Sequence, residues 1–270
     1  MPLVEVSGRK VYYETHGDAS GTPLVLAMGL AGSCLGWHAL QVPELSPHRR
    51  LILFDHRGVG ESEDPGGPFT TADLADDLAA LLDELGVDRV HLLGVFMGGM
   101  AAQEFALRHP ERLDRLVLVG CYARPDAKRR LLLEKWGAMA REGTSTEIFL
   151  RERLLWTLQE ETLEQTDLIE AMAKSFSGAG ALPMSPDLIA RQCEACLGHD
   201  TLDRLHEIAA PTLVLCGRND QLTPPKFHRQ LADEIPSGRL VTFQYGAHLV
   251  IAESAERFNE SVLAFLSARS

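Results

Sequence analysis

The chain has 270 residues, of which 45% are hydrophobic, and this content is sufficient for one large buried core. Its formal net charge of −12 argues against nucleic acid and anionic membrane surfaces as partners. We expect neither a signal peptide nor a membrane span, because no stretch is both long and uncharged enough. Five irregularly spaced cysteines are typical of free thiols in a reducing compartment, so the expected location is the cytoplasm.

The N-terminal part of the chain predicts several strands. Leu3–Val6 and Lys10–His16 flank a Ser-Gly pair and predict an antiparallel hairpin. Pro23–Met28 and Leu51–Asp55 are continuous apolar runs, which are typical of strands buried on both faces. Between these two runs, Trp37–Leu45 predicts a short helix.

A longer helix is predicted next, with a capping box of Thr70 and Asp73 at its start and Gly86 at its end. Its apolar residues recur at helical spacing: Leu74, Leu78, Leu81, Leu82 and Leu85. Buried strands that alternate with helices predict a parallel sheet covered on both sides.

The second half of the chain interrupts this alternation. After a predicted strand at Leu113–Val119, residues 124–200 show only helical periodicity. Strands resume at Pro211–Cys216 and Arg239–Tyr245, and Leu249–Leu266 predicts the last helix. The pattern therefore indicates one sheet with a helical insertion.

Residues 89–109 carry the main functional signal. Val90–Leu93 predicts a buried strand, Gly94–Gly98 a sharp bend, and Met97–His109 a helix that ends before a proline. This arrangement resembles the nucleophile elbow of the α/β-hydrolase family, Gly-x-Ser-x-Gly. The glycines leave room for a turn in which side chains would collide. In this sequence Phe96 occupies the nucleophile position, which normally holds Ser.

Two later segments strengthen the resemblance. Asp220 follows a strand where the family carries its triad acid, and His248 follows the last strand where the family carries its catalytic His. The order of nucleophile, acid and base is that of the family. The resemblance also implies an oxyanion hole formed by the backbone N–H groups of Leu30 and Met97. In such a site the imidazole takes the proton of the nucleophile, but Phe96 has none to give.

The resemblance covers nearly the whole chain and implies an α/β fold. We expect a mostly parallel eight-stranded sheet flanked by helices, with a cap of four or five helices inserted after strand 6. Residues 1–123 and 201–270 would form the core, and 124–200 the cap. The family implies a small-molecule substrate, no metal and no organic cofactor, and leaves a homo-oligomer open. Four residues are candidates for lining the substrate pocket: Gly29, Trp136, Trp156 and Leu249.

Other reactive groups offer alternatives to an absent serine. Three nucleophilic side chains lie near expected strand ends: Ser33, Cys34 and Cys121. The sequence shows no base beside them, so we do not assign them a catalytic role. Cys193, Cys196 and His199 could form a zinc site, but a lone Cys-x-x-Cys within a helix is a weak signal.

Three functional hypotheses follow from the sequence. The first is a serine esterase or lactonase for a small apolar substrate, impaired or inactivated by Phe96. The second is a non-hydrolytic lyase, cyclase, decarboxylase or isomerase that uses His248 and Asp220 as a general base, with Phe96 shaping the pocket. The third is a ligand-binding pseudo-enzyme. Whether the chain is an enzyme is therefore left open by the sequence.

Overall fold

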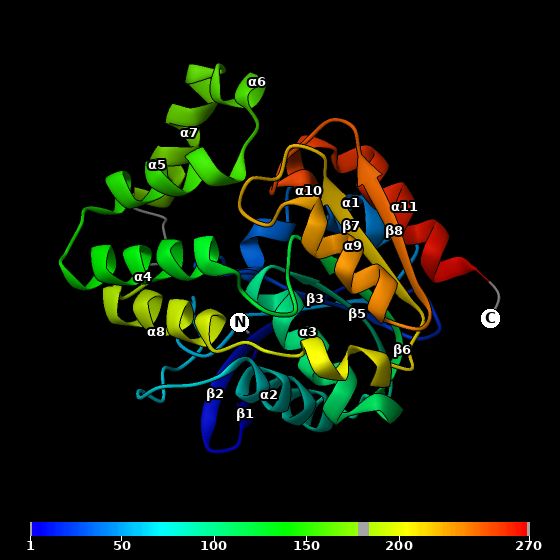
Figure 1. The fold of residues 1–270 in the computed structure, drawn as a ribbon. Coiled ribbons are helices and arrows are strands. Elements are labelled where there is room, and N and C mark those ends of the chain that lie inside the picture. The colour runs from blue at the N-terminus through cyan, green and yellow to red at the C-terminus, as the bar shows by residue number, and fades with distance from the viewer. Residues whose placement is uncertain (1, 178–183, 269–270) are drawn as a thin grey trace.

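One eight-stranded sheet organises the protein, in the order β1-β2-β4-β3-β5-β6-β7-β8 (Figure 1). The computed structural model describes residues 2–177 and 184–268. The strands are β1 (Leu3–Val6), β2 (Arg9–His16), β3 (Leu24–Ala27), β4 (Leu51–Phe54), β5 (Val90–Val95), β6 (Leu113–Val119), β7 (Thr212–Gly217) and β8 (Gly238–Phe243). The hairpin of β1 and β2 is antiparallel, as predicted, and β2 also pairs antiparallel with β4. The pairs from β4 to β8 are parallel.

The central strands are apolar because both of their faces are covered. Every residue of β3, β4, β5 and β7 is buried. Helices α2 and α3 pack against each other, and α1 packs against α11. The helices flanking the sheet are α1 (Val42–Leu45), α2 (Thr71–Glu84), α3 (Met97–Arg108), α9 (Pro225–Glu234), α10 (Val250–Glu253) and α11 (Ala255–Ser267). The predicted capping box is present, with Thr70 and Asp73 each accepting the other's backbone N–H.

A group of helices, here called the cap helices, lies between β6 and β7. They are α4 (Ala127–Arg141), α5 (Thr146–Thr157), α6 (Glu160–Leu163), α7 (Thr166–Ser177) and α8 (Pro186–Leu197). Figure 1 shows them in green and yellow-green to one side of the sheet, with α4 and α8 side by side. Residues 178–183, which belong to the predicted cap, lie outside the described residues.

Two predicted helices are wrong in their extent. The segment predicted as one helix at Trp37–Leu45 forms a 3-10 helix at Cys34–Trp37 and a separate α1. Pro43 explains the break, because a proline inside a helix lacks an N–H and collides with the preceding turn. The last predicted helix is divided into α10 and α11 at Ser254, whose hydroxyl donates to the carbonyl of Tyr245 at 2.6 Å.

No helix within the described ranges is long and apolar enough to cross a membrane.

Candidate active site

The elbow at the end of β5 contains a strained phenylalanine. Phe96 has φ 47° and ψ −109°, a region that side chains rarely enter and that costs on the order of 1–3 kcal/mol. Its N–H donates to the carbonyl of Val119 on β6, and its own carbonyl accepts the N–H of Met100 on α3, both at 2.9 Å. The sheet and the helix thus hold the strained conformation from both sides.

The glycines around Phe96 are required by close backbone approaches. A Cβ on Gly98 would lie 2.3 Å from the carbonyl oxygen of Ala27, at the end of β3. A Cβ on Gly94 would lie 2.3 Å from the carbonyl oxygen of Gly98 itself. Distances below about 3 Å exclude a side chain. The elbow therefore packs directly on the strand that leads into the loop of residues 28–33, here called the oxyanion loop.

Asp220 and His248 form a hydrogen-bonded pair, here called the dyad. His248 Nδ1 lies 3.0 Å from Asp220 Oδ2, and both side chains are buried. Thr223 donates its N–H to Asp220 Oδ1 and its hydroxyl to Oδ2, each at 2.7 Å. Sequence reasoning missed Thr223, although an acid followed three residues later by Thr is a common local hydrogen-bonding pattern.

The surroundings of the dyad keep the carboxyl ionised. Burial alone raises the pKa of Asp220, but the charge and hydrogen bond of His248 outweigh it, so the net pKa lies below the ordinary value. His228 on α9 also faces Asp220, and burial lowers the pKa of His228 to about 4.

Phe96 and the dyad meet face to edge. The ring of Phe96 lies 5.3 Å from the imidazole of His248 between centroids, at an interplanar angle of 81°. The same ring lies 6.1 Å from that of Tyr122 between centroids. The Nε2 of His248 makes no hydrogen bond to any described residue, so the atom that would take a proton is not engaged. The structure therefore brings the three predicted catalytic positions together.

The oxyanion loop places Gly29 and Leu30 beside the elbow. A Cβ on Gly29 would lie 3.3 Å from the Cβ of Phe96. The N–H groups of Leu30 and Met97 donate to no acceptor in the described part of the chain. His56 Nε2 lies 3.1 Å from the carbonyl of Met28 and supports the start of the loop. Two unused backbone donors beside Phe96 are what an oxyanion hole requires.

Comparison with known proteins identifies the family. The family model described as alpha/beta hydrolase fold matches residues 22–255. The chain belongs to this family. The fold class and the family predicted from the sequence are thereby confirmed.

The relatives are similar over almost their full length. The chain is 32% identical over 263 residues to "Putative carbamate hydrolase RutD" from Caulobacter sp. (strain K31), covering 96% of this chain and 97% of that protein. The enol-lactonase from Burkholderia xenovorans LB400 is 29% identical with a TM-score of 0.88, covering 99% of this chain and 100% of that one. A hydrolase from Pseudomonas aeruginosa PA01 is 30% identical with a TM-score of 0.89, covering 99% and 98%.

The predicted pocket tryptophans of this alpha/beta hydrolase share one carboxylate within the cap helices. Trp136 and Trp156 direct their Nε1 atoms to Glu152 Oε1, at 3.4 and 3.1 Å. Trp136 is buried and packs on Phe149 at 6.3 Å between ring centroids. Leu249 follows His248 and donates its N–H to a carbonyl of α5 at 2.9 Å, so it joins the dyad loop to the cap helices. Their role in a substrate pocket stays a prediction.

The alternative nucleophiles are poorly suited to the chemistry. Cys121 is fully buried beside Gln103, and burial raises the pKa of its thiol to about 12. Burial raises the pKa of Cys34 still further, so neither residue is a thiolate at neutral pH. Ser33 begins the 3-10 helix, and its side chain makes no capping hydrogen bond there.

The weak Cys-x-x-Cys signal does not correspond to a group of potential metal ligands within the described residues. His199, the third residue of that pattern, lies with its Nδ1 2.9 Å from the hydroxyl of Thr71. Among the described residues, Glu14, His16 and His38 do bring three potential ligand atoms together. Glu14 and His16 lie on β2, and His38 follows the 3-10 helix at Cys34–Trp37. Glu14 Oε2 lies 2.7 Å from Nε2 of His16 and 2.8 Å from Nε2 of His38, so the three side chains contact one another.

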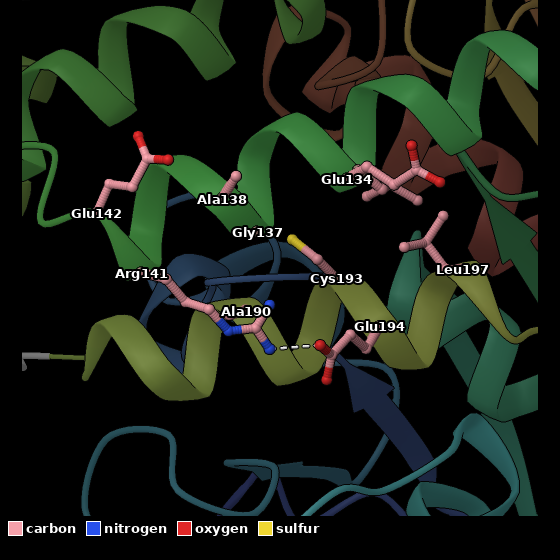
Figure 2. Close-up of a pocket in the computed structure, with 10 residues that line it drawn as sticks. Glu134, Gly137, Ala138, Arg141, Glu142, Ala190, Cys193, Glu194 and Leu197 are labelled. Carbon is pink, nitrogen blue, oxygen red and sulfur yellow. Dashed lines mark hydrogen bonds and ion pairs between the residues drawn. The ribbon is translucent and has the colours of Figure 1, made fainter.

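A groove of about 350 Å³ lies between α4 and α8, and Figure 2 shows the residues that line it. Arg141 and Glu194 form an ion pair across it. Its lining residues belong to the cap helices, and none comes from the elbow, the oxyanion loop or the dyad. The groove is therefore separate from the candidate active site.

Proposed function

We propose that this alpha/beta hydrolase has a site built for acyl transfer on a small, largely apolar ester or lactone, and that Phe96 leaves it hydrolytically impaired or inactive. The observation that carries the proposal is the strained backbone of Phe96, which faces an intact dyad. The names of two relatives, an enol-lactonase and a carbamate hydrolase, support attack on an acyl carbon as the reaction class.

The chemistry follows from what each group can do. With a serine at position 96, the hydroxyl would attack the acyl carbon while His248 Nε2 took its proton. Asp220 would hold the imidazole in the required tautomer and stabilise its cation. The N–H groups of Leu30 and Met97 would bind the oxyanion. Phe96 removes the first step only, because a phenyl ring cannot be acylated.

The test is to supply the missing nucleophile. Hydrolysis of p-nitrophenyl esters and simple lactones would be measured for the protein, for Phe96→Ser and for Phe96→Ala. We expect Phe96→Ser to exceed Phe96→Ala by about 10³-fold or more, since loss of the serine cost about 10⁶ in a serine protease. Phe96→Ala is the matched control, because it opens the same space without adding a hydroxyl. Equal activity in the two folded variants would exclude the proposal.

A second function is favoured by one observation: among the described residues His248 Nε2 has no hydrogen-bond partner, although Asp220 orients the ring. A dyad of this kind works as a general base without any covalent intermediate, in a lyase, cyclase, decarboxylase or isomerase, and contributes about 10²–10⁴ to the rate. This function requires His248 in the protein as it stands. A non-hydrolytic turnover that His248→Ala leaves unchanged would exclude it.

A further inference from the structure

Two side chains from the cap helices hold the peptide unit that follows the proposed oxyanion donor. Arg153 on α5 donates from Nη2 to the carbonyl of Leu30 at 2.9 Å. Gln192 on α8 accepts the N–H of Ala31 on its Oε1 at 2.8 Å. These are the two polar groups of one peptide unit. The cap helices therefore reach the oxyanion loop with one cation and one neutral amide.

The charge of Arg153 is not balanced by the described chain. Arg151, two residues earlier on the same helix, forms an ion pair with Glu147 at 3.1 Å, but Arg153 forms none among the described residues. Residues 173–183, whose side chains are outside the description, contain no Asp or Glu in the sequence. Burial lowers the pKa of Arg153 to about 10, so the guanidinium is still charged at neutral pH. No described carboxylate therefore balances the charge of this guanidinium.

Unused donors accompany this unpaired charge. The Nε of Arg153 and the Nε2 of Gln192 are buried and have no hydrogen-bond partner within the part of the chain that the structure describes. Gln192 is fully buried, so bulk water does not reach its amide. An unpaired buried donor is unfavourable, and an acceptor on a ligand would remove that cost. A carboxylate consists only of acceptors and matches the planar fork of a guanidinium.

We propose that Arg153 binds a carboxylate carried by the substrate, so that the natural substrate is a short ester or lactone with a free acid group. The ester or lactone part rests on the proposed function, whereas the anion site rests on Arg153. Nη2 is held by the carbonyl of Leu30, and the other donors of the guanidinium make no hydrogen bond to a described residue, so they can meet the ligand. Leu30 would thus bind the oxyanion with its N–H while its carbonyl positions the group that binds the acid. In a chain of net charge −12, a local cation is needed to attract an anion.

Binding can be tested without hydrolysis. Titration calorimetry would compare monomethyl glutarate, which carries one carboxylate, with the neutral dimethyl glutarate, using the protein and Phe96→Ala, which lacks the ring. We expect the monoester to bind Phe96→Ala at least tenfold more tightly than the diester. Arg153→Met should weaken monoester binding by about tenfold to a hundredfold and leave diester binding unchanged, since charged hydrogen bonds have this strength. Because no nucleophile is involved, the result stands whether or not Phe96→Ser restores hydrolysis.

Two further variants keep the test decisive. Arg151→Met removes a cation from the same helix that already has a carboxylate partner, and it should leave monoester binding unchanged. Arg153→Lys keeps the charge without the planar fork, and it should give an intermediate loss even if Arg153→Met is poorly folded. Equal binding of the two esters, an equal loss in Arg151→Met, or no monoester binding at millimolar concentration would each overturn the proposal.

Discussion

The two halves of the candidate site both have a well-defined geometry, but their side chains differ in chemical reactivity. At the elbow, β5 and α3 hold Phe96 in a strained conformation, yet its ring has neither a proton nor a lone pair to offer. In the other half, the loops after β7 and β8 hold the side chains of Asp220 and His248 3.0 Å apart, and both side chains are titratable. Backbone geometry and side-chain chemistry are therefore set by different residues in this site.

The elbow geometry comes from its neighbours rather than from the residue at its tip. Gly94 and Gly98 allow β5, α3 and the end of β3 to approach, and the hydrogen bonds of Phe96 use only its backbone. The geometry of the dyad, in contrast, is made by side chains, with Thr223 donating twice to Asp220. Replacing a polar side chain should therefore disturb the geometry of the dyad most. Replacing a glycine should disturb the backbone geometry of the elbow most.

The largest expected effect lies in the dyad. In the Phe96→Ser variant, Asp220→Asn should lower the turnover of p-nitrophenyl esters by about 10⁴-fold, as the same change does in a serine protease. The amide NH2 of Asn could donate to Nδ1 and hold the imidazole in the wrong tautomer, and the neutral amide could not stabilise the imidazole cation. Asp203→Asn, at an exposed acid paired with Arg124, is the control and should not change turnover. A loss of less than tenfold would mean that Asp220 does not support the base.

The elbow should respond through stability. Gly98→Ala would place a Cβ 2.3 Å from the carbonyl oxygen of Ala27, and the backbone must move to relieve this contact. We expect the free energy of unfolding in denaturant to fall by at least about 3 kcal/mol. Gly198→Ala at the end of α8 is the control, because its Cβ would lie at an ordinary 3.5 Å from the nearest atom. Similar losses in the two variants would show that the elbow is not tightly packed.

Local patterns explain why the sheet and most site residues could be predicted. The apolar run of β5, the glycines after it, and an acid and a histidine after later strands are all visible within a few residues. Arg153 and Gln192 could not be found this way, because their contacts in the oxyanion loop are 123 and 161 residues away. On α5 and α8 they are indistinguishable in sequence from the polar face of any surface helix.

The predicted extents of two helices were wrong for a related reason. Helical spacing continues through Leu249–Leu266, but Ser254 bonds to the carbonyl of Tyr245, nine residues earlier, and this contact divides the segment. Periodicity shows which residues are apolar. A helix, however, ends where other hydrogen bonds compete with those of the helix backbone. The break before Pro43 can be predicted from the sequence, since proline is disfavoured inside a helix.

The smallest expected effect concerns the histidine beside the dyad. Burial lowers the pKa of His228 to about 4 in the folded protein, against an ordinary 6.5, and its charged neighbours there are Asp220 and His248. A histidine whose pKa is lower in the folded protein than in the unfolded chain contributes its full stabilisation when the pH is above the pKa of the unfolded chain. That contribution is lost as the pH falls from 6.5 towards 4, because the unfolded chain binds the proton first. The buried His228 should therefore make the fold less stable at acidic pH.

Replacing His228 by Leu should remove this part of the acid sensitivity. Urea unfolding at pH 7 and pH 4.5 would give the pH-dependent loss of stability for the protein and for the variant. We expect the loss to be smaller in His228→Leu by on the order of 2 kcal/mol, since one pKa unit corresponds to about 1.4 kcal/mol. All other titrating groups largely cancel between the two proteins, and His48→Leu at an exposed position should give no such reduction. An unchanged loss in His228→Leu would mean that His228 accepts a proton in the folded protein as readily as in the unfolded chain, so the surroundings of the dyad would be wetter than its burial indicates.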